Sequence, residues 1–111
     1  MTHQMNLAHE PFAKIKSGTK TIEMRLFDEK RAAIRPGDII VFTDLETNQA
    51  LSCAVRQLYR YPDFDELYRH HDKISIGYGA DDTATPDDML AYYTKEQIAK
   101  YGVVGIAIKP L

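Results

Sequence analysis

The chain has 111 residues, of which 44% are hydrophobic and 27% charged, and its formal net charge is −2. These values are ordinary for a globular protein and correspond to the size of one domain. No stretch approaches the roughly 20 apolar residues of a membrane span, and the N-terminus lacks the basic and apolar segments of a secretory signal. We therefore expect a cytoplasmic protein with no membrane partner. The only cysteine, Cys53, excludes an internal disulfide and is expected in the core.

Alternating polar and apolar residues, turn residues and capping signals predict about five strands and several short helices. The expected strands cover residues 4–7, 21–27, 39–43, 50–59 and 103–108. The expected helices cover residues 11–17, a segment that begins at 62–67, and two short segments that begin at Thr85 and at Thr94, the second ending at Gly102. Residues 28–33 are expected to form a turn or a short helix. Because strands and helices do not alternate strictly, the pattern favours a small mixed β-barrel of the α+β class.

Several of these predictions depend on single residues. Gly18 suits the left-handed position that ends a helix, because glycine has no Cβ to clash there. Thr85 before a proline has the pattern of a helix N-cap. Thr94, with Gln97 three residues later, has the pattern of a capping box. The consecutive apolar residues 39–42 predict a strand that is buried on both faces.

Residues 18–25 concentrate charged side chains where a helix end meets a strand. Side chains alternate between the two faces of a strand, so Glu23 and Arg25 are expected to share one face. The opposite face is apolar and consists of Ile22, Met24 and Leu26. Lys20 lies in the turn just before the strand, where it can lean over the face of Glu23 and Arg25. The sequence therefore predicts a compact cluster of one acidic and two basic side chains.

This stretch also carries a family resemblance. Gly18, Lys20, Glu23 and Arg25 have the spacing G-x-K-x-x-E-x-R, which resembles the signature of the ASCH (activating signal cointegrator homology) domain. The resemblance extends over nearly the whole chain, with supporting segments at residues 10–12, 35–38 and 101–106. It implies a single ASCH domain over residues 1–111 with a PUA-like fold, a small barrel with helices. It also implies the functions found in that family, which are RNA binding, coactivation and, among small bacterial members, hydrolysis of acetylated cytidine or of RNA.

Positive charge is concentrated in residues 14–35. This segment contains seven lysine or arginine residues and three acidic ones, a net charge of +4, so the rest of the chain carries −6. Such an asymmetry can steer an anionic ligand towards one side of the molecule. It is equally compatible with two solvated faces of opposite sign.

The charged cluster permits three roles. In recognition, Arg25 holds a phosphate or carboxylate through paired N–H bonds and Lys20 supplies a point charge. In catalysis, Glu23 accepts a proton from water, while Lys20 stabilises the developing oxyanion or donates a proton. In the structural alternative, Glu23 and Arg25 satisfy each other as an ion pair, which at a surface is worth about 0–1 kcal/mol.

The resemblance also bears on which chemistry to expect. In the amidohydrolases that remove the acetyl group from acetylcytidine, the motif lysine acts with a threonine three residues later and with a distant glutamate. Here Glu23 occupies the position of that threonine. Asp81 and Asp82 are the only candidates for the distant carboxylate. The sequence therefore fits a water-activating lysine–glutamate site, or no chemistry at all, better than a threonine nucleophile.

Aromatic residues and one long loop complete the expected site. The loop over residues 74–84 is expected to be mobile and to cover the cleft, because long loops in compact domains are often lids or binding segments. Tyr78 and Tyr93 are the candidates to stack on a base, although the stretch around Tyr78 is equally compatible with a disordered excursion. His70 and His71 are adjacent and make a poor metal pair, so no metal and no other cofactor is expected.

The leading hypothesis is an ASCH-domain protein that binds RNA or a modified nucleoside in a cleft lined by Lys20, Glu23, Arg25, Tyr78 and Tyr93. The alternative is a small hydrolase, an amidohydrolase or a ribonuclease, in which Lys20 and Glu23 are catalytic. A third hypothesis is a regulatory or interaction module without a small ligand. That module is indicated if the cleft is filled by its own side chains and Glu23 pairs with Arg25. No pattern in the sequence indicates an oligomeric state.

Overall fold

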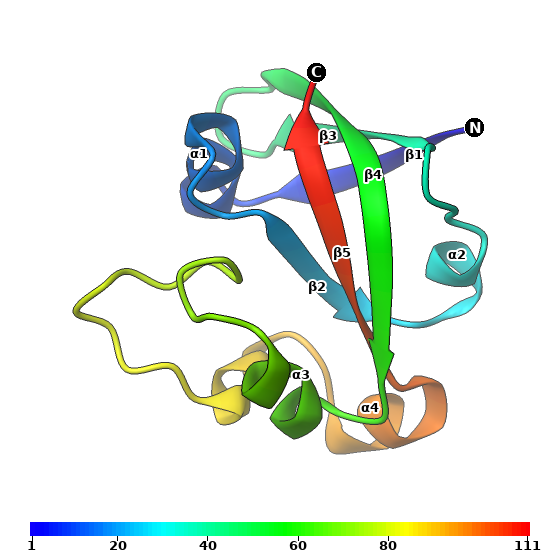
Figure 1. Cartoon of the computed structure of the whole chain (residues 1–111), viewed down its shortest axis with the longest axis vertical. Helices are drawn as coiled ribbons and strands as arrows, with labels where there is room; N and C mark the ends of the chain where they lie inside the picture. Colours follow the sequence, from blue (N-terminus) through cyan, green and yellow to red (C-terminus); the bar gives the residue numbers. More distant parts are fainter.

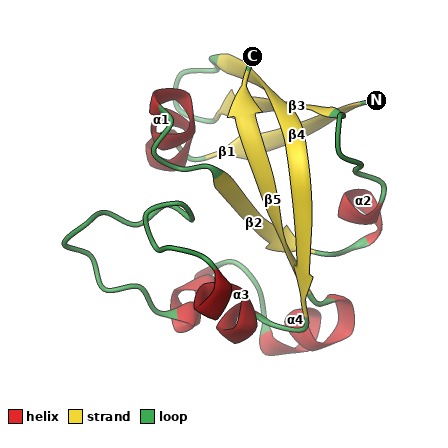
Figure 2. Ribbon diagram, viewed as in Figure 1, coloured by secondary structure: helices red, strands yellow, loops and turns green.

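The computed structural model describes residues 1–111, which form one curled five-stranded sheet with short helices around it (Figure 1; Figure 2). The strands are β1 (Thr2–Leu7), β2 (Ile22–Leu26), β3 (Ile39–Asp44), β4 (Ala50–Tyr61) and β5 (Val103–Pro110). The helices are α1 (His9–Ser17), α2 (Glu29–Ala32), α3 (Phe64–His70), the 3₁₀ helix η1 (Pro86–Ala91) and α4 (Lys95–Tyr101). None of them has the length and hydropathy that crossing a bilayer requires.

The strand order is β1-β3-β4-β5-β2, with β1 parallel to β3 and the other pairs antiparallel. The sheet curls but does not close, because β1 and β2 each pair with a single neighbour. The result is a half-barrel with two free edges. The expected α+β class, with about five strands and several short helices, is confirmed, and the expected small barrel is an open half-barrel.

The register of β2 against β5 confirms the predicted division of side chains between two faces. Glu23 lies opposite Ile106 and Arg25 lies opposite Val104. Val104 and Ile106 both belong to a first core of twelve residues, to which α1 contributes Phe12 and Ile15. The apolar face of β2 contributes to a second core under α3 and η1, which consists of Ile22, Leu26, Phe64, Leu67, Ile76, Met89 and Val103. Strand β2 therefore presents its charged face to one side of the sheet and its apolar face to the other.

Strands β3 and β4 differ from the sequence prediction. Strand β3 is fully buried on one face only, since Ile40 and Phe42 are inaccessible whereas Ile39 and Val41 are half-buried. The reason is that α3 packs on β4 and β5 and leaves the outer face of β3 uncovered. Strand β4 runs to Tyr61, beyond the expected end at residue 59, and carries a β-bulge between Val55 and Gln57. Cys53 is fully buried, as expected.

Helix ends follow the capping signals with one exception. Gly18 ends α1 with a left-handed φ of 89° and donates to the Ile15 carbonyl at 3.1 Å. Thr94 and Gln97 form both hydrogen bonds of a capping box at the start of α4. The prediction for Thr85 is wrong in detail, because its side chain makes no capping bond and the segment that follows is a 3₁₀ helix.

The segment between α3 and η1 is tied to the sheet at its beginning. The Ser75 carbonyl accepts from the backbone N–H groups of Thr21 and Ile22 at 2.9 and 3.0 Å. Ile76 is 2% exposed and belongs to the second core. The first half of the loop therefore covers the free edge at the start of β2, and the rest extends away from the sheet (Figure 1).

Candidate functional site

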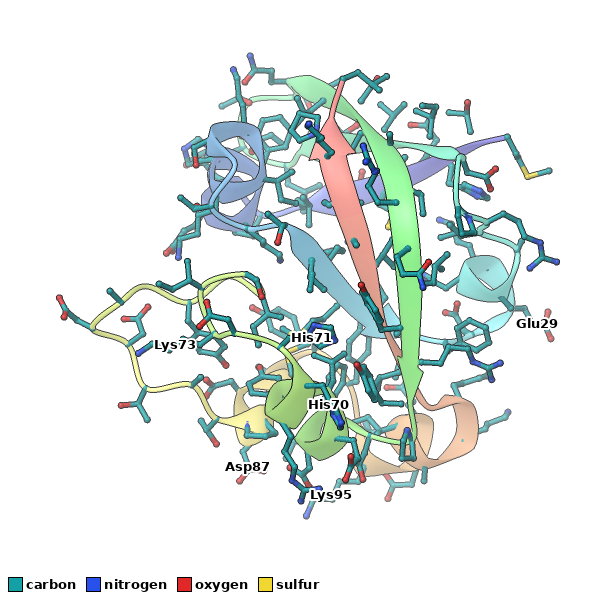
Figure 3. All side chains as sticks on the ribbon, viewed as in Figure 1. Glu29, His70, His71, Lys73, Asp87 and Lys95 are labelled. Carbon is teal, nitrogen blue, oxygen red and sulfur yellow. The ribbon has the colours of Figure 1, made fainter.

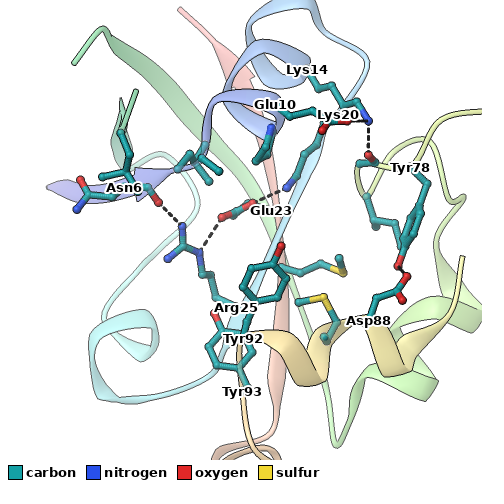
Figure 4. Close-up of a pocket in the computed structure, with 18 of the residues that line it drawn as sticks. Asn6, Glu10, Lys14, Lys20, Glu23, Arg25, Tyr78, Asp88, Tyr92 and Tyr93 are labelled. Atoms are coloured by element: carbon teal, nitrogen blue, oxygen red, sulfur yellow. Dashed lines mark hydrogen bonds and ion pairs between the residues drawn. The ribbon is translucent and has the colours of Figure 1, made fainter. Parts of the chain in front are cut away.

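The predicted charged cluster forms a three-residue ion-pair network (Figure 4). The Lys20 Nζ lies 2.7 Å from Oε1 of Glu23, and the Arg25 Nε donates to Oε2 of the same carboxylate at 2.7 Å. The Arg25 Nη2 also donates to the carbonyl of Asn6 on β1 at 2.9 Å. Glu23 is 3% exposed and Lys20 is 8% exposed. Arg25 therefore bridges the two free edges of the half-barrel, and Glu23 holds both cations.

Local structure accounts for the position of each partner. Gly18 ends α1, and the backbone N–H groups of Thr19 and Lys20 then both donate to the Lys14 carbonyl at 3.1 Å, which fixes the turn. Lys20 leaves this turn just before β2, as predicted. Glu23 and Arg25 are two residues apart on the strand and so project from the same face.

The network keeps Glu23 ionised. Burial by itself would raise the pKa of Glu23, but the positive charges of Lys20 and Arg25 and their hydrogen bonds outweigh it and hold the pKa below its ordinary value. An efficient general base has a pKa near the working pH. With both oxygens bonded and a lowered pKa, Glu23 is a strong hydrogen-bond acceptor and a weak base in this structure.

A cavity of about 560 Å³ opens beside the network. Its floor includes Lys20, Glu23 and Arg25. Its walls come from the start of α1, from the loop that follows α3, and from η1, and they include Pro11, Lys14, Ile76, Gly77, Tyr78, Met89 and Tyr93 (Figure 4). The Glu23–Arg25 pair expected of a purely structural role is thus present, but the side chains do not fill the cleft.

The charges that line the cavity are balanced. Three are positive and three are negative, namely Lys14, Lys20, Arg25, Glu10, Glu23 and Asp88. Lys14 also donates to the Gly77 carbonyl at 2.7 Å and lies 3.3 Å from Glu10. The remaining lysines and arginines of the basic segment 14–35 do not line the cavity. Their positive charge therefore does not make the cavity a cationic site.

The two predicted tyrosines both line the cavity and are held in place. The Tyr78 hydroxyl lies 2.7 Å from Oδ2 of Asp88 and 2.8 Å from the hydroxyl of Tyr68. A hydroxyl has one proton, so Tyr78 donates to the carboxylate and accepts from Tyr68. Burial and the hydrogen bond that its hydroxyl donates to Asp88 raise the pKa of Tyr78 far above its ordinary value. Tyr93 stacks on Phe64 with ring centroids 6.1 Å apart, and burial raises its pKa.

Comparison with known proteins decides the family. A sequence model described as ASCH domain matches residues 5–111. This chain belongs to the ASCH domain family. The half-barrel described above is the PUA-like fold of that family. No curated protein matches the sequence.

Several solved structures are similar to this chain. The crystal structure of hypothetical protein PH0355 is 34% identical in sequence, covers 100% of both chains and has a TM-score of 0.85. The solution NMR structure of protein PF0455 from Pyrococcus furiosus is also 34% identical, covers 100% of this chain and 98% of its own, and has a TM-score of 0.76. A mutant of ZmASCH from Zymomonas mobilis is similar in fold, at 13% identity and a TM-score of 0.63 over 98% of this chain and 70% of that one.

The cavity of this ASCH domain includes residues that the sequence did not single out. Tyr92 and Leu45 line it although their side chains are 73% and 64% exposed. Tyr92 follows η1, and Leu45 lies in the turn between β3 and β4. Exposed apolar groups of this size are informative when they border a concave site. The available signals were the Tyr92–Tyr93 doublet and a leucine in an otherwise polar hairpin turn.

The expected distant carboxylates lie elsewhere in this ASCH domain. Neither Asp81 nor Asp82 lines the cavity, and Asp82 accepts from the Gly79 backbone N–H at 2.7 Å. The cavity carboxylates besides Glu23 are Glu10 and Asp88. For Asp82 the reason is a local turn of the loop, in which the carboxylate accepts a hydrogen bond from the loop's own backbone.

The two adjacent histidines lie at the end of α3 (Figure 3), and neither of them lines the cavity. His70 stacks on Tyr61, and Nε2 of His71 lies 2.8 Å from the Tyr61 hydroxyl. Burial, followed by the neighbouring His70, lowers the pKa of His71. No group of three or more His, Cys, Asp or Glu side chains is placed to hold a metal ion.

Proposed function

We propose that the chain is a single ASCH domain that binds a nucleoside, free and modified or unstacked from an RNA strand, in the 560 Å³ cavity. The observation that carries the proposal is the composition of this cavity, which combines an aromatic wall with a polar floor whose charges are balanced. Its volume falls within the roughly 300–1,000 Å³ of small-molecule sites. A nucleobase is planar and uncharged, and it carries both hydrogen-bond donors and acceptors on its edge.

The floor supplies both kinds of partner. Glu23 is a carboxylate that can accept from an exocyclic amine, the pairing by which acidic side chains recognise cytosine. Lys20 has three N–H donors and uses one on Glu23. Arg25 uses Nε and Nη2 within the protein, so its Nη1 group is available to a base carbonyl. Tyr78 and Tyr93 supply ring surface, and stacking on an aromatic side chain is worth about 1–3 kcal/mol per base.

The charge balance favours a base over a phosphate chain as the cavity ligand. Binding of a polyanion releases counterions, and the logarithm of its affinity falls with the logarithm of salt by about 0.7 per phosphate contact for single strands. A neutral nucleoside has no such term. We therefore expect nucleoside affinity to change little between 50 and 300 mM salt.

The test is an NMR titration of the ¹⁵N-labelled protein with cytidine, acetylcytidine and the other common nucleosides. Saturable shifts are expected at Lys20, Glu23 and Tyr93. The Lys20→Ala variant should lose them, whereas Lys16→Ala should not, because Lys16 is an exposed lysine of the same basic segment that does not line the cavity. Shifts that are absent with every nucleoside, or that are equally weakened in both variants, contradict the proposal.

One observation favours hydrolysis as a second candidate function. The Lys20 ammonium and the Glu23 carboxylate are in contact at 2.7 Å in a nearly inaccessible position, and a substrate that separated them would raise the pKa of Glu23 towards a useful range for a base. Turnover of acetylcytidine and of short RNAs should then be lost in Lys20→Ala and Glu23→Ala. Activity unchanged in both variants removes this site from any mechanism.

A further inference from the structure

A second hollow of about 240 Å³ lies away from the cavity, beside α2. Its floor is apolar and consists of side chains that belong to or pack against the first core, including Phe27, Ile34 and Leu58. Its charged lining residues are Arg35 and Arg60. No acidic side chain lines this hollow, in contrast to the balanced charges of the cavity.

Both arginines keep their guanidinium groups unpaired. Neither Arg35 nor Arg60 forms an ion pair, and neither donates a side-chain hydrogen bond within the chain. By contrast, Arg25 on β2 forms an ion pair with Glu23, and Arg31 on α2 forms one with Asp28. Two free guanidinium groups beside one hollow are the arrangement that binds phosphate through paired N–H donors.

The bulge in β4 places Arg60 at this hollow. Across the register shift, Val55 pairs with Ile108 and Arg60 pairs with Val104, which both belong to the first core. The extra residue at the bulge is Arg56. Without that residue the side-chain alternation would place Tyr59 and Tyr61, and not Arg60, on the first-core face. A bulge that re-aims a side chain in this way is often a device for a binding site.

The two arginines are also held on rigid supports. The Arg60 guanidinium carbon lies 3.9 Å from the centre of the Phe27 ring, a cation–π contact that restrains the guanidinium group and uses none of its N–H donors. Arg35 belongs to a turn in which its backbone N–H donates to Oδ2 of Asp38 at 3.0 Å. This turn is joined to β4 because the Gly37 N–H donates to the Val55 carbonyl at 2.8 Å. Little ordering of these supports is therefore needed when a ligand binds.

We propose that the hollow formed by Arg35, Arg60 and Gln57 is a binding site for a phosphate group. The chemistry is shared by a free phosphate ion and by one phosphodiester of an RNA strand. The site is separate from the proposed nucleoside cavity, because the two share no lining residue. A nucleoside without phosphate therefore tests the cavity alone, and inorganic phosphate tests the hollow.

The variants that test the proposal each remove one positive charge. Arg60→Gln and Arg35→Gln remove the two guanidinium groups of the hollow. Arg56→Gln is the matched control, since Arg56 is an exposed arginine on the same strand that does not line the hollow. Because Arg60 packs on Phe27, thermal unfolding of Arg60→Gln is measured first. If Arg60→Gln is unfolded, the test is made with Arg35→Gln, whose substitution lies in an exposed turn.

The readouts are an NMR titration with inorganic phosphate and fluorescence anisotropy with a single-stranded uridine oligomer. Phosphate should shift the amides of residues 35, 57 and 60 saturably. Loss of either guanidinium should weaken phosphate binding about 10-fold, the scale of one charge-assisted hydrogen bond, and Arg56→Gln less than about 2-fold.

The two arms separate the sources of the phosphate group. If RNA is the source, the slope of the logarithm of oligomer affinity against the logarithm of salt concentration should become less steep by about 0.7 in Arg60→Gln. That is the contribution of one phosphate contact to a single strand. If oligomer binding is unaffected while phosphate binding is lost, the ligand is a free phosphate group. An absence of saturable shifts with both probes, or an equal loss in Arg60→Gln and Arg56→Gln, overturns the proposal.

Discussion

Replacing Glu23 by glutamine tests the ion-pair network most directly. Glutamine has the same shape but no charge, and it leaves Lys20 and Arg25 without the carboxylate that both contact at 2.7 Å. Lys20 is the more sensitive partner, because its side chain is only 8% exposed and no other acidic group lies within ion-pair distance. Arg25 keeps its bond to the Asn6 carbonyl.

The expected cost follows from this geometry. Removing one member of a buried ion pair typically destabilises a protein by about 3–5 kcal/mol. We expect about 3 kcal/mol, the lower end, since the glutamine carbonyl still accepts one hydrogen bond and Arg25 has a second partner. For a chain of this size that corresponds to a fall in Tm of about 12 °C.

The assay is urea unfolding of the wild type and Glu23→Gln at pH 7, with Glu66→Gln as control. Glu66 forms a surface ion pair with Arg69, whose side chain is 67% exposed, so its loss should cost less than about 1 kcal/mol. Because the pKa of Glu23 is lowered in the folded state, its ionised carboxylate stabilises the fold at pH values above 4.5, the ordinary pKa of glutamate. This stabilisation is lost as the pH falls through the lowered pKa. The gap between the wild type and Glu23→Gln should therefore narrow in acid. A variant that matches the wild type at pH 7 refutes the network as a stabilising element.

Three other perturbations test separate features. Tyr92→Ala should weaken nucleoside binding by about 1–3 kcal/mol in a titration but leave Tm unchanged, because the ring borders the cavity and is 73% exposed. Gly18→Ala should lower the free energy of unfolding by about 1–2 kcal/mol, since its φ is 89° and a Cβ would meet no atom within 4 Å, so backbone strain alone acts. The hydrogen bond with Asp44 raises the pKa of His9. The stabilisation of the fold by this bond is therefore complete below pH 6.5 and is lost as the pH rises through the raised pKa. Urea midpoints of the wild type should accordingly fall relative to His9→Gln between pH 6 and 9, and a constant difference would argue against this bond.

Local patterns were sufficient to predict most of the sheet and the charged cluster. The alternation in residues 21–27 fixed which side chains share a face, and the register of β2 against β5 confirms it. The turn after Gly18 is equally local, so the position of Lys20 beside Glu23 followed from spacing. These features depend on neighbours within a few residues, which a single sequence contains.

Features that depend on distant packing were not predicted. The uncovered face of β3 depends on where α3 packs, and the end of β4 depends on a bulge that no local pattern marks. The same holds for the cavity wall. Asp88 and Leu45 reach it only because η1 and the β3–β4 turn are brought to the same side of the half-barrel by the fold.

Gly77 joins the wall of the cavity to its floor. Its φ is +116°, and a Cβ at this position would lie 3.3 Å from the Lys20 side chain. Its carbonyl is held by Lys14 at 2.7 Å. A side chain at position 77 would therefore crowd Lys20 where it meets Glu23, and glycine is the residue that lets the loop pass this close to the ion pair.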